Sequence, residues 1–319
     1  MIYFENEEGF ALVSADADRP DIVAFIEHGS LAPGQEIENP GFQLFLNGYA
    51  KYSRFQPFEP IRLRPGTEPQ LVWRFDMHIP PMLTTQWSQG APYNKFCFTP
   101  SGNHASAGCI PVALGQIVAY HQYPTSYDGH VYDWDSILQD STVSVYDVSA
   151  SNSVGHLIHD IGILVNTYYG EGGSESYEWT VPNMWNSFGY HYQSSSSCDF
   201  DSLRVNLARN NPVCMFGFGI VDGFTIGHAW VIDGIAIRSQ YNLSVYINDP
   251  ILPFFPHPIE QSYNLVHCNW GWGGLDDGYF IYEALNQKFD TSTNTISEFE
   301  VNFYDIHRVH WQIHPETDN

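Results

Sequence analysis

The pattern of apolar and polar positions predicts two strands and then a helix near the start of the chain. Residues 9–15 and 21–27 are short apolar runs separated by acidic residues and a proline, which is typical of two strands joined by a turn. In the helix that follows, Asn39 can cap the first turn and Pro40 suits the first helical position. The apolar face of this helix recurs at helical spacing and consists of Phe42, Phe45, Leu46 and Tyr49. We therefore expect a small α+β module over residues 1–70.

A proline-rich stretch at residues 57–69 separates this module from the rest of the chain. Its four prolines and Gly66 remove amide donors and fix backbone dihedrals, which is typical of a linker. Helical patterns come first after it, at 109–122, 154–168 and 201–209. Patterns rich in β-branched and aromatic residues follow, at 212–220, 228–237, 243–249 and 299–313. Helices followed by strands predict an α+β fold for residues 71–319, without an alternating βαβ sheet.

Composition and charge narrow the class of protein. Of the 319 residues, 43% are hydrophobic and 15% are charged, which excludes a disordered chain or a coiled coil. The formal net charge of −24 repels phosphate backbones and anionic lipids, so we expect neither nucleic acid nor a membrane as a partner. The first ten residues lack the basic and apolar regions of a signal peptide.

The five cysteines point away from a structural metal site. No CxxC spacing occurs among Cys97, Cys109, Cys198, Cys214 and Cys268, which argues against zinc or a thioredoxin-like motif. We expect no metal and no cofactor. A free, reactive thiol remains one interpretation.

Cys109 is the strongest candidate for such a thiol. The segment 106–124 is apolar on nearly every face, so it predicts a buried helix. Pro111 is tolerated only in the first turn, which places Cys109 at the helix N-terminus. The free amides there favour thiolate and should lower the pKa of the thiol. The alternative interpretation is a small buried cysteine.

A proton acceptor is available at the start of a predicted strand, where His228 follows Gly227. A histidine in a strand is more often structural, so this residue alone decides nothing. We do not expect Asp233 to be its partner, because side chains alternate along a strand and residue 233 points to the opposite face.

A third segment, residues 267–280, combines four glycines with two tryptophans. Glycines let the backbone approach closely, and the indoles supply a rigid apolar wall. The side-chain amide of Asn269 could accept an imidazole N–H. The alternative is a glycine-rich turn packed on tryptophan, but the three segments together favour a thiol-based catalytic site.

These segments resemble the streptopain-like cysteine peptidases, a branch of the papain-like fold, over nearly the whole chain. GCIPVALGQIVAYHQYP is similar to that family's nucleophile helix, GHAWVIDG to its histidine strand, and NWGWGG with DGYF to its asparagine and tryptophan segment. QWSQGAPYN resembles the stretch whose glutamine helps to form the oxyanion hole, which corresponds to Gln89 and not to Gln86. The resemblance implies a two-lobed α+β fold, with a helical lobe followed by an antiparallel β lobe.

The resemblance also implies roles for individual residues. Cys109 would attack a peptide carbonyl, His228 would share and return the proton, and Asn269 would hold the imidazole. The Cys109 amide and the Gln89 side chain would stabilise the oxyanion, and Trp270 would cover the contact between Asn269 and His228. The family's substrate cleft would be lined by Ser174 and Ser176, in the loop 170–176, together with Gly227.

The N-terminal module is similar to the family's pro-segment, which occupies and silences the active cleft. The chain would then be the zymogen of an endopeptidase, with proteins or peptides as substrates and its own pro-segment as an intramolecular inhibitor. Residues 1–70 carry net charge −6 and the remainder −18, so docking should rest on apolar contact. The family is normally exported, so the missing leader implies an incomplete or misassigned start. One departure is Ile110–Pro111 after the nucleophile, where the family usually has small and β-branched residues.

Two other classes of function remain open on the residues alone. Nine tryptophans and twenty tyrosines could furnish a noncatalytic carbohydrate- or protein-binding surface, and the same fold could carry an acyltransferase. His156, His159 and Asp160 lie within one helical turn, but we do not expect them to bind a metal. The peptidase interpretation accounts for the most residues.

Overall fold

The computed structural model describes residues 2–3, 9–14, 22–32, 34–55, 71–196, 199–221, 224–242, 259–285 and 305–316. The predicted linker at 57–69, the strand predicted at 243–249 and Cys198 lie outside these residues. No helix in the described ranges is long and apolar enough to cross a membrane.

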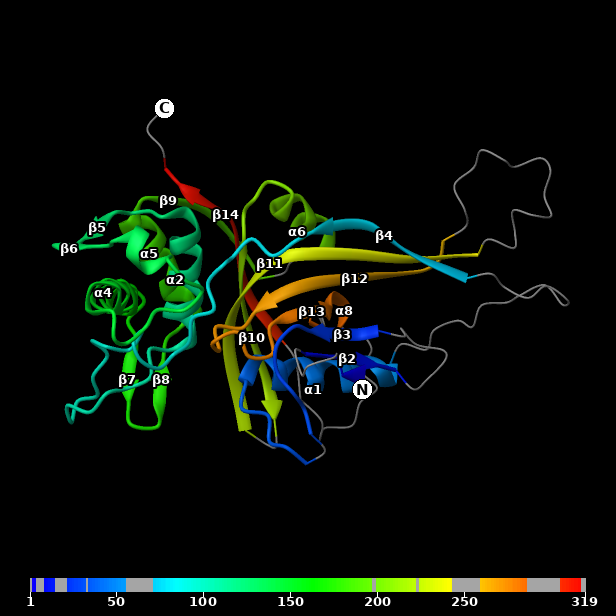
Figure 1. The fold of residues 1–319 in the computed structure, drawn as a ribbon, viewed down its shortest axis with the longest axis horizontal. Helices are drawn as coiled ribbons and strands as arrows, with labels where there is room; N and C mark the ends of the chain where they lie inside the picture. Colours follow the sequence, from blue (N-terminus) through cyan, green and yellow to red (C-terminus); the bar gives the residue numbers. More distant parts are fainter. Residues whose placement is uncertain are drawn as a thin grey trace, which may run out of the picture.

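A single antiparallel sheet of ten strands organises the described part of the chain (Figure 1). The strands are β1 (Ile2–Tyr3), β2 (Phe10–Val13), β3 (Ile22–Ile26), β4 (Leu71–Ile79), β9 (Tyr190–Ser195), β10 (Val213–Val221), β11 (Phe224–Asn242), β12 (Ile259–Asn269), β13 (Gly278–Ile281) and β14 (Asp305–Pro315). Their order is β1-β2-β3-β13-β12-β11-β10-β14-β9, and β4 pairs with the second half of β11. Strand β11 pairs with β12 only from Val231 onward, opposite Asn269. The chain leaving β12 can therefore turn beside the first part of β11.

Helices cover the sheet in two groups. The helices are α1 (Pro40–Phe55), α2 (Cys109–His121), α3 (Trp134–Ile137), α4 (Val148–Leu164), α5 (Val181–Phe188), α6 (Phe200–Leu207), α8 (Tyr282–Leu285) and the 3-10 turn η2 (Glu178–Thr180). Figure 1 shows α2, α4 and α5 together on one side, with the hairpins β5–β6 (Ser126–Tyr127 and His130–Val131) and β7–β8 (Tyr168–Gly170 and Gly173–Glu175). The other group packs on the opposite side of the sheet and contains α1, α6 and α8.

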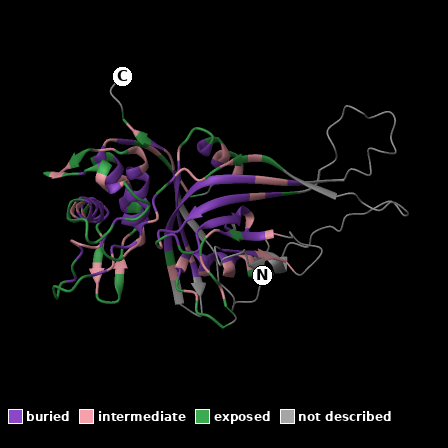
Figure 2. Cartoon of the chain, in the orientation of Figure 1, coloured by how far each residue is buried: buried purple, intermediate pink, exposed green. Residues whose placement is uncertain are grey.

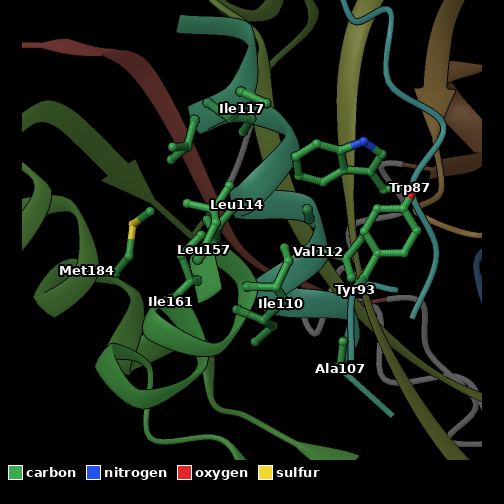
Figure 3. Close-up of a cluster of buried hydrophobic side chains, with 14 of the residues drawn as sticks. Trp87, Tyr93, Ala107, Ile110, Val112, Leu114, Ile117, Leu157, Ile161 and Met184 are labelled. Carbon is green, nitrogen blue, oxygen red and sulfur yellow. The ribbon is translucent and has the colours of Figure 1, made fainter. Parts of the chain in front are cut away.

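Alternate side chains of the central strands belong to two different cores. Cys214 of β10, with Ala229 and Val231 of β11, belongs to the core that includes residues of α2, α4 and α5. Figure 3 shows part of this core, where Leu114 of α2 lies near Leu157 of α4 and Met184 of α5. The neighbouring positions Met215 and Trp230 face the core that α1 shares. This period of two follows from the pleat of the strand. Because a core lies on each side of the sheet, both faces of the central strands are buried (Figure 2).

The N-terminal module joins the same sheet and has no separate core within the described residues. Strand β3 pairs with β13, with Ala24 opposite Phe280. Helix α1 begins where predicted, because the Asn39 side chain accepts hydrogen bonds from the amides of Gly41 and Phe42. The predicted apolar face of α1 packs on the core: Phe42 and Phe45 are fully buried, and Leu46 and Tyr49 are partly buried against it.

The predicted fold class is confirmed, and most predicted elements are present. The helix predicted at 109–122 is α2, and the one predicted at 201–209 is α6; the helix predicted at 154–168 begins earlier and ends earlier, as Val148–Leu164. The early start arises because Asp147 caps the helix by accepting from the amide of Ala150. The sequence pattern did not identify β4, β9, β12 or α5.

One local charge contact modifies the expectation that only apolar contact holds the module. The Glu27 carboxylate, which follows β3, lies 3.8 Å from Nε2 of His267 in β12. Net charges of the two parts still repel, but this pair attracts. Strand pairing, apolar burial and one ion pair together hold the module in place.

We predict that Gly41→Ala destabilises the full chain, since a Cβ at Gly41 would overlap the Trp270 indole. Overpacking of this kind typically costs about 1–3 kcal/mol. Urea unfolding of the parent and the variant measures the difference. Gly172→Ala is the matched control, because a Cβ there meets no atom within 4 Å. Equal effects of the two substitutions would contradict the close packing of α1 on Trp270.

Candidate active site

Cys109 is the first residue of α2, and the residues around it fix its position. Gly108 precedes it with φ of 90°, a conformation that favours glycine, so the chain can turn sharply into the helix. Pro111 lies in the first turn, as predicted, and residues 110–119 are all buried. The nucleophile candidate is thus anchored at the end of a helix that is buried all round.

The environment of the Cys109 thiol differs from the expectation. Burial raises the pKa of the thiol, and nearby backbone groups of Ala229 and Ile110 oppose this shift without cancelling it. The prediction that the helix N-terminus lowers the thiol pKa is therefore wrong for this conformation, because desolvation of the thiolate outweighs the backbone hydrogen bonds. The resting form of Cys109 here is the neutral thiol.

His228 is buried in β11, and its ring has one fixed hydrogen bond. Nε2 lies 2.9 Å from the backbone oxygen of Trp270. A carbonyl oxygen can only accept, so Nε2 carries the proton and the neutral ring keeps its lone pair on Nδ1. Burial lowers the pKa of His228 to about 4, although the Trp270 carbonyl acts in the opposite direction. The imidazole is therefore a neutral base with a defined tautomer.

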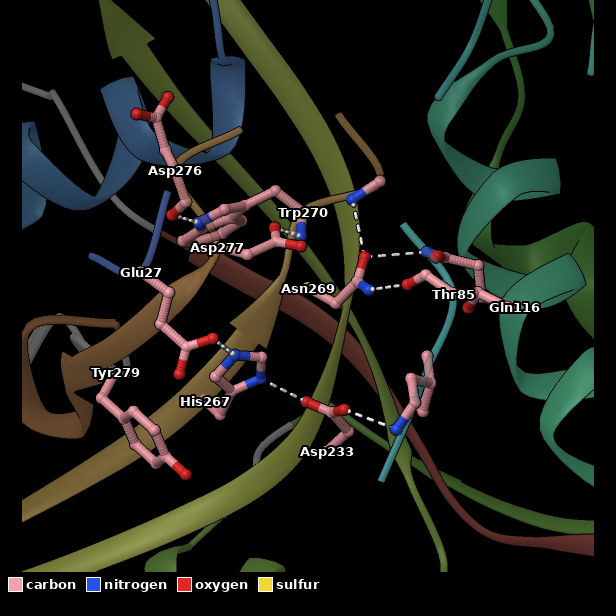
Figure 4. Close-up of polar contacts among 12 residues, drawn as sticks. Glu27, Thr85, Gln116, Asp233, His267, Asn269, Trp270, Asp276, Asp277 and Tyr279 are labelled. Carbon is pink, nitrogen blue, oxygen red and sulfur yellow. Dashed lines mark hydrogen bonds and ion pairs between the residues drawn. The ribbon is translucent and has the colours of Figure 1, made fainter. Parts of the chain in front are cut away.

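Asn269 does not make the contact that was expected of it. Its Oδ1 accepts from Nε2 of Gln116 at 2.8 Å and from the amide of Gly271 at 3.0 Å, and its Nδ2 donates to the oxygen of Thr85 at 2.8 Å (Figure 4). The place predicted for the Asn269 side chain is taken by the backbone carbonyl of the next residue. The reason is geometric: β12 pairing ends at Asn269, and the turn that follows brings its backbone to His228.

Cys109 and His228 line one cavity of about 240 Å³. Within the described residues, no hydrogen bond joins the thiol to the imidazole. Both groups are therefore present at one site but are not engaged with each other in this conformation.

The three residues predicted to bind substrate also line this cavity: Ser174, Ser176 and Gly227. Ser174 is fixed by donating its hydroxyl to the oxygen of Ser106 at 2.5 Å. A Cβ at Gly227 would lie 2.6 Å from the Phe218 ring, so only glycine allows this ring to pack directly on the backbone of β11. The rest of the lining is apolar at Ile110, Phe216 and Phe218, and polar at Glu175, Tyr177 and Glu178.

Gln89 lies beside the nucleophile segment. Its backbone oxygen accepts from the amide of Ala107 at 2.9 Å, and its side-chain Oε1 accepts from the Ser106 hydroxyl at 2.9 Å. The second bond fixes the amide, so Nε2 is the donor end that remains for a substrate. Gln86 instead bonds through Oε1 to the Ser141 hydroxyl, at 3.2 Å, and packs against Gly274. The structure therefore places Gln89, and not Gln86, next to residues 106–109.

The two tryptophans of the third segment have different surroundings. Trp270 is fully buried, with its ring 5.4 Å from Trp230 and 5.1 Å from Phe280, and its indole N–H donates to the oxygen of Asp276. Its ring lies 6.3 Å from that of His228, so it shields this side of the imidazole. Trp272 lines a second cavity of about 370 Å³ with Gln89.

Asp233 belongs to a different, buried group of charges, as the alternation argument required. Its carboxylate accepts from the Leu83 amide at 2.9 Å and lies 2.6 Å from Nδ1 of His267. Burial acts to lower the pKa of His267, but the Asp233 carboxylate outweighs it and raises the pKa to about 10. The contact between Asp233 and His267, and that of Glu27 with His267, were not identified from the sequence, because nothing local links residues 27, 233 and 267 (Figure 4).

No group of three ligands suited to a metal occurs among the described residues. Asp160 accepts from the Tyr132 hydroxyl at 2.8 Å and lies 2.9 Å from Nδ1 of His130. His159 is 3.8 Å from the same carboxylate. Asp160, Tyr132 and His130 therefore form a hydrogen-bonded group at α4.

Cys97, Cys214 and Cys268 are free and buried.

A cysteine at the start of a buried helix and a histidine on the facing sheet line one cavity, an arrangement typical of cysteine-type hydrolases. The profile of the Peptidase C10 family matches residues 87–280, and the chain belongs to this family.

Curated relatives agree with this assignment, and two solved structures share the fold. Streptopain of Streptococcus pyogenes serotype M28 (strain MGAS6180) is 26% identical over 89% of this chain and 74% of its own length. Thiol protease/hemagglutinin PrtT of Porphyromonas gingivalis is 25% identical over 88% of this chain, which spans about a third (33%) of that protein. A prointerpain A fragment of Prevotella intermedia shares the fold, with a TM-score of 0.62 at 22% identity over 95% of this chain and 91% of that one. Active interpain A of the same organism gives 0.52 at 21% identity, over 75% and 95% of the two chains.

We predict that Asp277→Asn stabilises the chain increasingly as pH rises from 5 to 8. Burial raises the pKa of Asp277 to about 7, and the carboxylate accepts from the Trp270 amide at 2.8 Å, a bond that asparagine can keep. A carboxyl with a raised pKa contributes stability below its unfolded pKa, and this is lost as pH rises to the folded value.

Urea unfolding at pH 5 and pH 8 measures the change. Each pKa unit corresponds to about 1.4 kcal/mol, so the gain from pH 5 to pH 8 should exceed about 1 kcal/mol. Asp140→Asn, at an exposed position, is the control. An advantage that shrinks at pH 8 would show that ionised Asp277 is stabilising.

Proposed function

We propose that the chain is a cysteine endopeptidase that is made in a latent form, with Cys109 as nucleophile and His228 as the proton acceptor. The observation that carries this proposal is the shared cavity: a helix-terminal thiol and a buried imidazole of fixed tautomer line the same space. Membership of the Peptidase C10 family supports it.

The chemistry follows from these positions. Nδ1 of His228 takes the Cys109 proton as the sulfur attacks the peptide carbonyl, and the imidazolium then protonates the leaving amine. The Trp270 carbonyl keeps its bond to Nε2–H throughout and stabilises the imidazolium. The Cys109 amide and the Gln89 side chain donate to the oxyanion, and losing one such donor typically costs about 10²- to 10³-fold in rate. Water then releases the acyl group from sulfur.

The lining of the 240 Å³ cavity suits a protein or peptide substrate. Ile110, Phe216 and Phe218 offer apolar contact to one side chain. Ser174, Ser176 and the exposed edge at Gly227 surround the same space with groups that an extended backbone can bond. The cavity near Trp272 and Gln89 also contacts the segment before Cys109, at Ala105 and Ser106, and suits the leaving part of the substrate.

Latency is supported by the unengaged thiol and by the position of the N-terminal module. The expectation that the module occupies the active cleft is not met by its described residues, none of which lines the Cys109 cavity. Instead, α1 packs on the Trp270 indole, and the Trp270 carbonyl bonds to His228. The module would therefore influence His228 through the turn that carries Trp270. Because β4 is paired with β11 over residues 71–79, the cut that releases the module should fall before residue 71. Action on exported or extracellular protein accords with the family resemblance.

We predict that Cys109→Ala abolishes proteolysis, by at least about 10³-fold, while the fold survives the loss of one small side chain. His228→Ala should be nearly as severe. Digestion of a generic unfolded protein, followed by mass spectrometry, measures the effect. Cys214→Ala, a buried cysteine outside the cavity, is the matched control and should keep its activity. A folded Cys109→Ala protein that cuts as fast as the parent would refute the assignment.

We also predict that the uncut chain is inactive and that activity rises in step with cleavage before residue 71. The measurement is a time course of N-terminal sequence and activity on the same samples. Added salt, at about 1 M, should not release the module, because strand pairing and apolar burial are not screened. Full activity of uncut protein, or dissociation driven by salt, would contradict this mechanism.

A further inference from the structure

Gln116 is a buried polar residue on the same helix as Cys109, two turns further on. It is fully buried, and α2 around it is apolar from Ile110 to Ala119. Both ends of its amide are used: Oε1 accepts from the Trp87 amide at 3.2 Å, and Nε2 donates to Oδ1 of Asn269 at 2.8 Å. A buried amide with both ends bonded to distant segments has one fixed orientation.

The bond to Asn269 leads toward the general base. Oδ1 of Asn269, held by Gln116, also accepts from the Gly271 amide at 3.0 Å, and Gly271 has φ of 66°. Trp270 lies between these two residues, so its carbonyl is part of the turn that the bond closes. That carbonyl accepts Nε2–H of His228. Three hydrogen bonds therefore connect the Gln116 side chain to the imidazole; the two at Asn269 are drawn in Figure 4.

The hydrogen bond to Trp87 connects Gln116 to the segment that carries Gln89, the proposed oxyanion donor. The Trp87 amide bonds to Gln116, the Trp87 oxygen accepts from the Gly273 amide at 2.9 Å, and Gln89 follows two residues later. Thr85, in the same segment, accepts from Nδ2 of Asn269. One side chain on the nucleophile helix thus joins the segment that carries Gln89 to the turn that holds His228.

We propose that Gln116 is a positioning residue: from the nucleophile helix it orients the Trp270 carbonyl through Asn269, and so fixes the tautomer and direction of the His228 imidazole. This inference rests on the proposed peptidase function. Gln116 touches neither the substrate cavity nor the thiol, so its effect passes through other groups. It also gives Asn269 a role, since the asparagine stabilises the turn and does not bond to the ring.

The test uses the full chain, processed to the active form, in the parent and in two variants. Gln116→Met keeps the size of the side chain and removes both hydrogen bonds. Gln116→Glu keeps the acceptor for Trp87 and, when protonated, also donates to Asn269. Asn206→Leu is the control, because Asn206 is buried and bonded through both ends, to Ser202 and Gln312, without any link to the site. Peptide kinetics across pH and thermal unfolding are measured for each protein.

We expect Gln116→Met to lower kcat about tenfold with KM within about twofold, since loss of one or two buried hydrogen bonds has this scale. The acid limb of its kcat/KM profile, which reports protonation of the His228 base, should move to lower pH, because the carbonyl no longer stabilises the imidazolium. The activity of Gln116→Glu relative to the parent should recover as pH falls. Asn206→Leu should lose stability and keep the parent kinetics and pH profile.

Unchanged kcat and pH limbs in folded Gln116→Met would overturn the inference, as would losses that match those of Asn206→Leu at equal stability. If Gln116→Met does not fold, the test rests on Gln116→Glu. A loss of activity in Gln116→Glu that does not depend on pH would also overturn the inference. Failure of the proposed function looks different, because the parent itself would then not cleave peptides.

Discussion

The hydrogen bond from Nε2 of His228 to the Trp270 carbonyl is the constraint on which the site depends. A carbonyl can only accept, so this single contact assigns the ring proton and leaves Nδ1 as the base. The contact exists because β12 stops pairing with β11 at Asn269, so the following turn lies beside His228. Asn269, Gln116 and the carboxylate of Asp277 then hold that turn in place.

The same turn is where the N-terminal module meets the catalytic part. Strand β3 extends the sheet at β13, and Gly41 allows α1 to lie directly on the Trp270 indole. Burial raises the pKa of Cys109 and lowers that of His228 to about 4. The proposed mechanism requires the thiol to pass its proton to the ring, and no hydrogen bond joins these two groups among the described residues, so activation must change the surroundings of both.

Local signals in the sequence were sufficient for much of this picture. The cap at Asn39, the position of Pro111 and the buried helix after Cys109 follow from residues within a few positions of one another, and each was predicted correctly. The hydrogen bond from His228 to the Trp270 carbonyl could not be predicted, because every residue type carries a backbone carbonyl. Nor could the Asp233–His267 pair or the burial that raises the Cys109 pKa, since both depend on packing between distant segments.

The central claim is that one thiol, Cys109, becomes a nucleophile once the module is removed. Labelling with a thiol-directed peptide inhibitor at low concentration, with mass spectrometric location of the adduct, tests it most directly. The processed protein should carry one label, on Cys109, and the uncut chain should be labelled far more slowly; His228→Ala should suppress the reaction. Labelling of Cys97, Cys214 or Cys268 in preference to Cys109, or equal rates before and after processing, would contradict the claim.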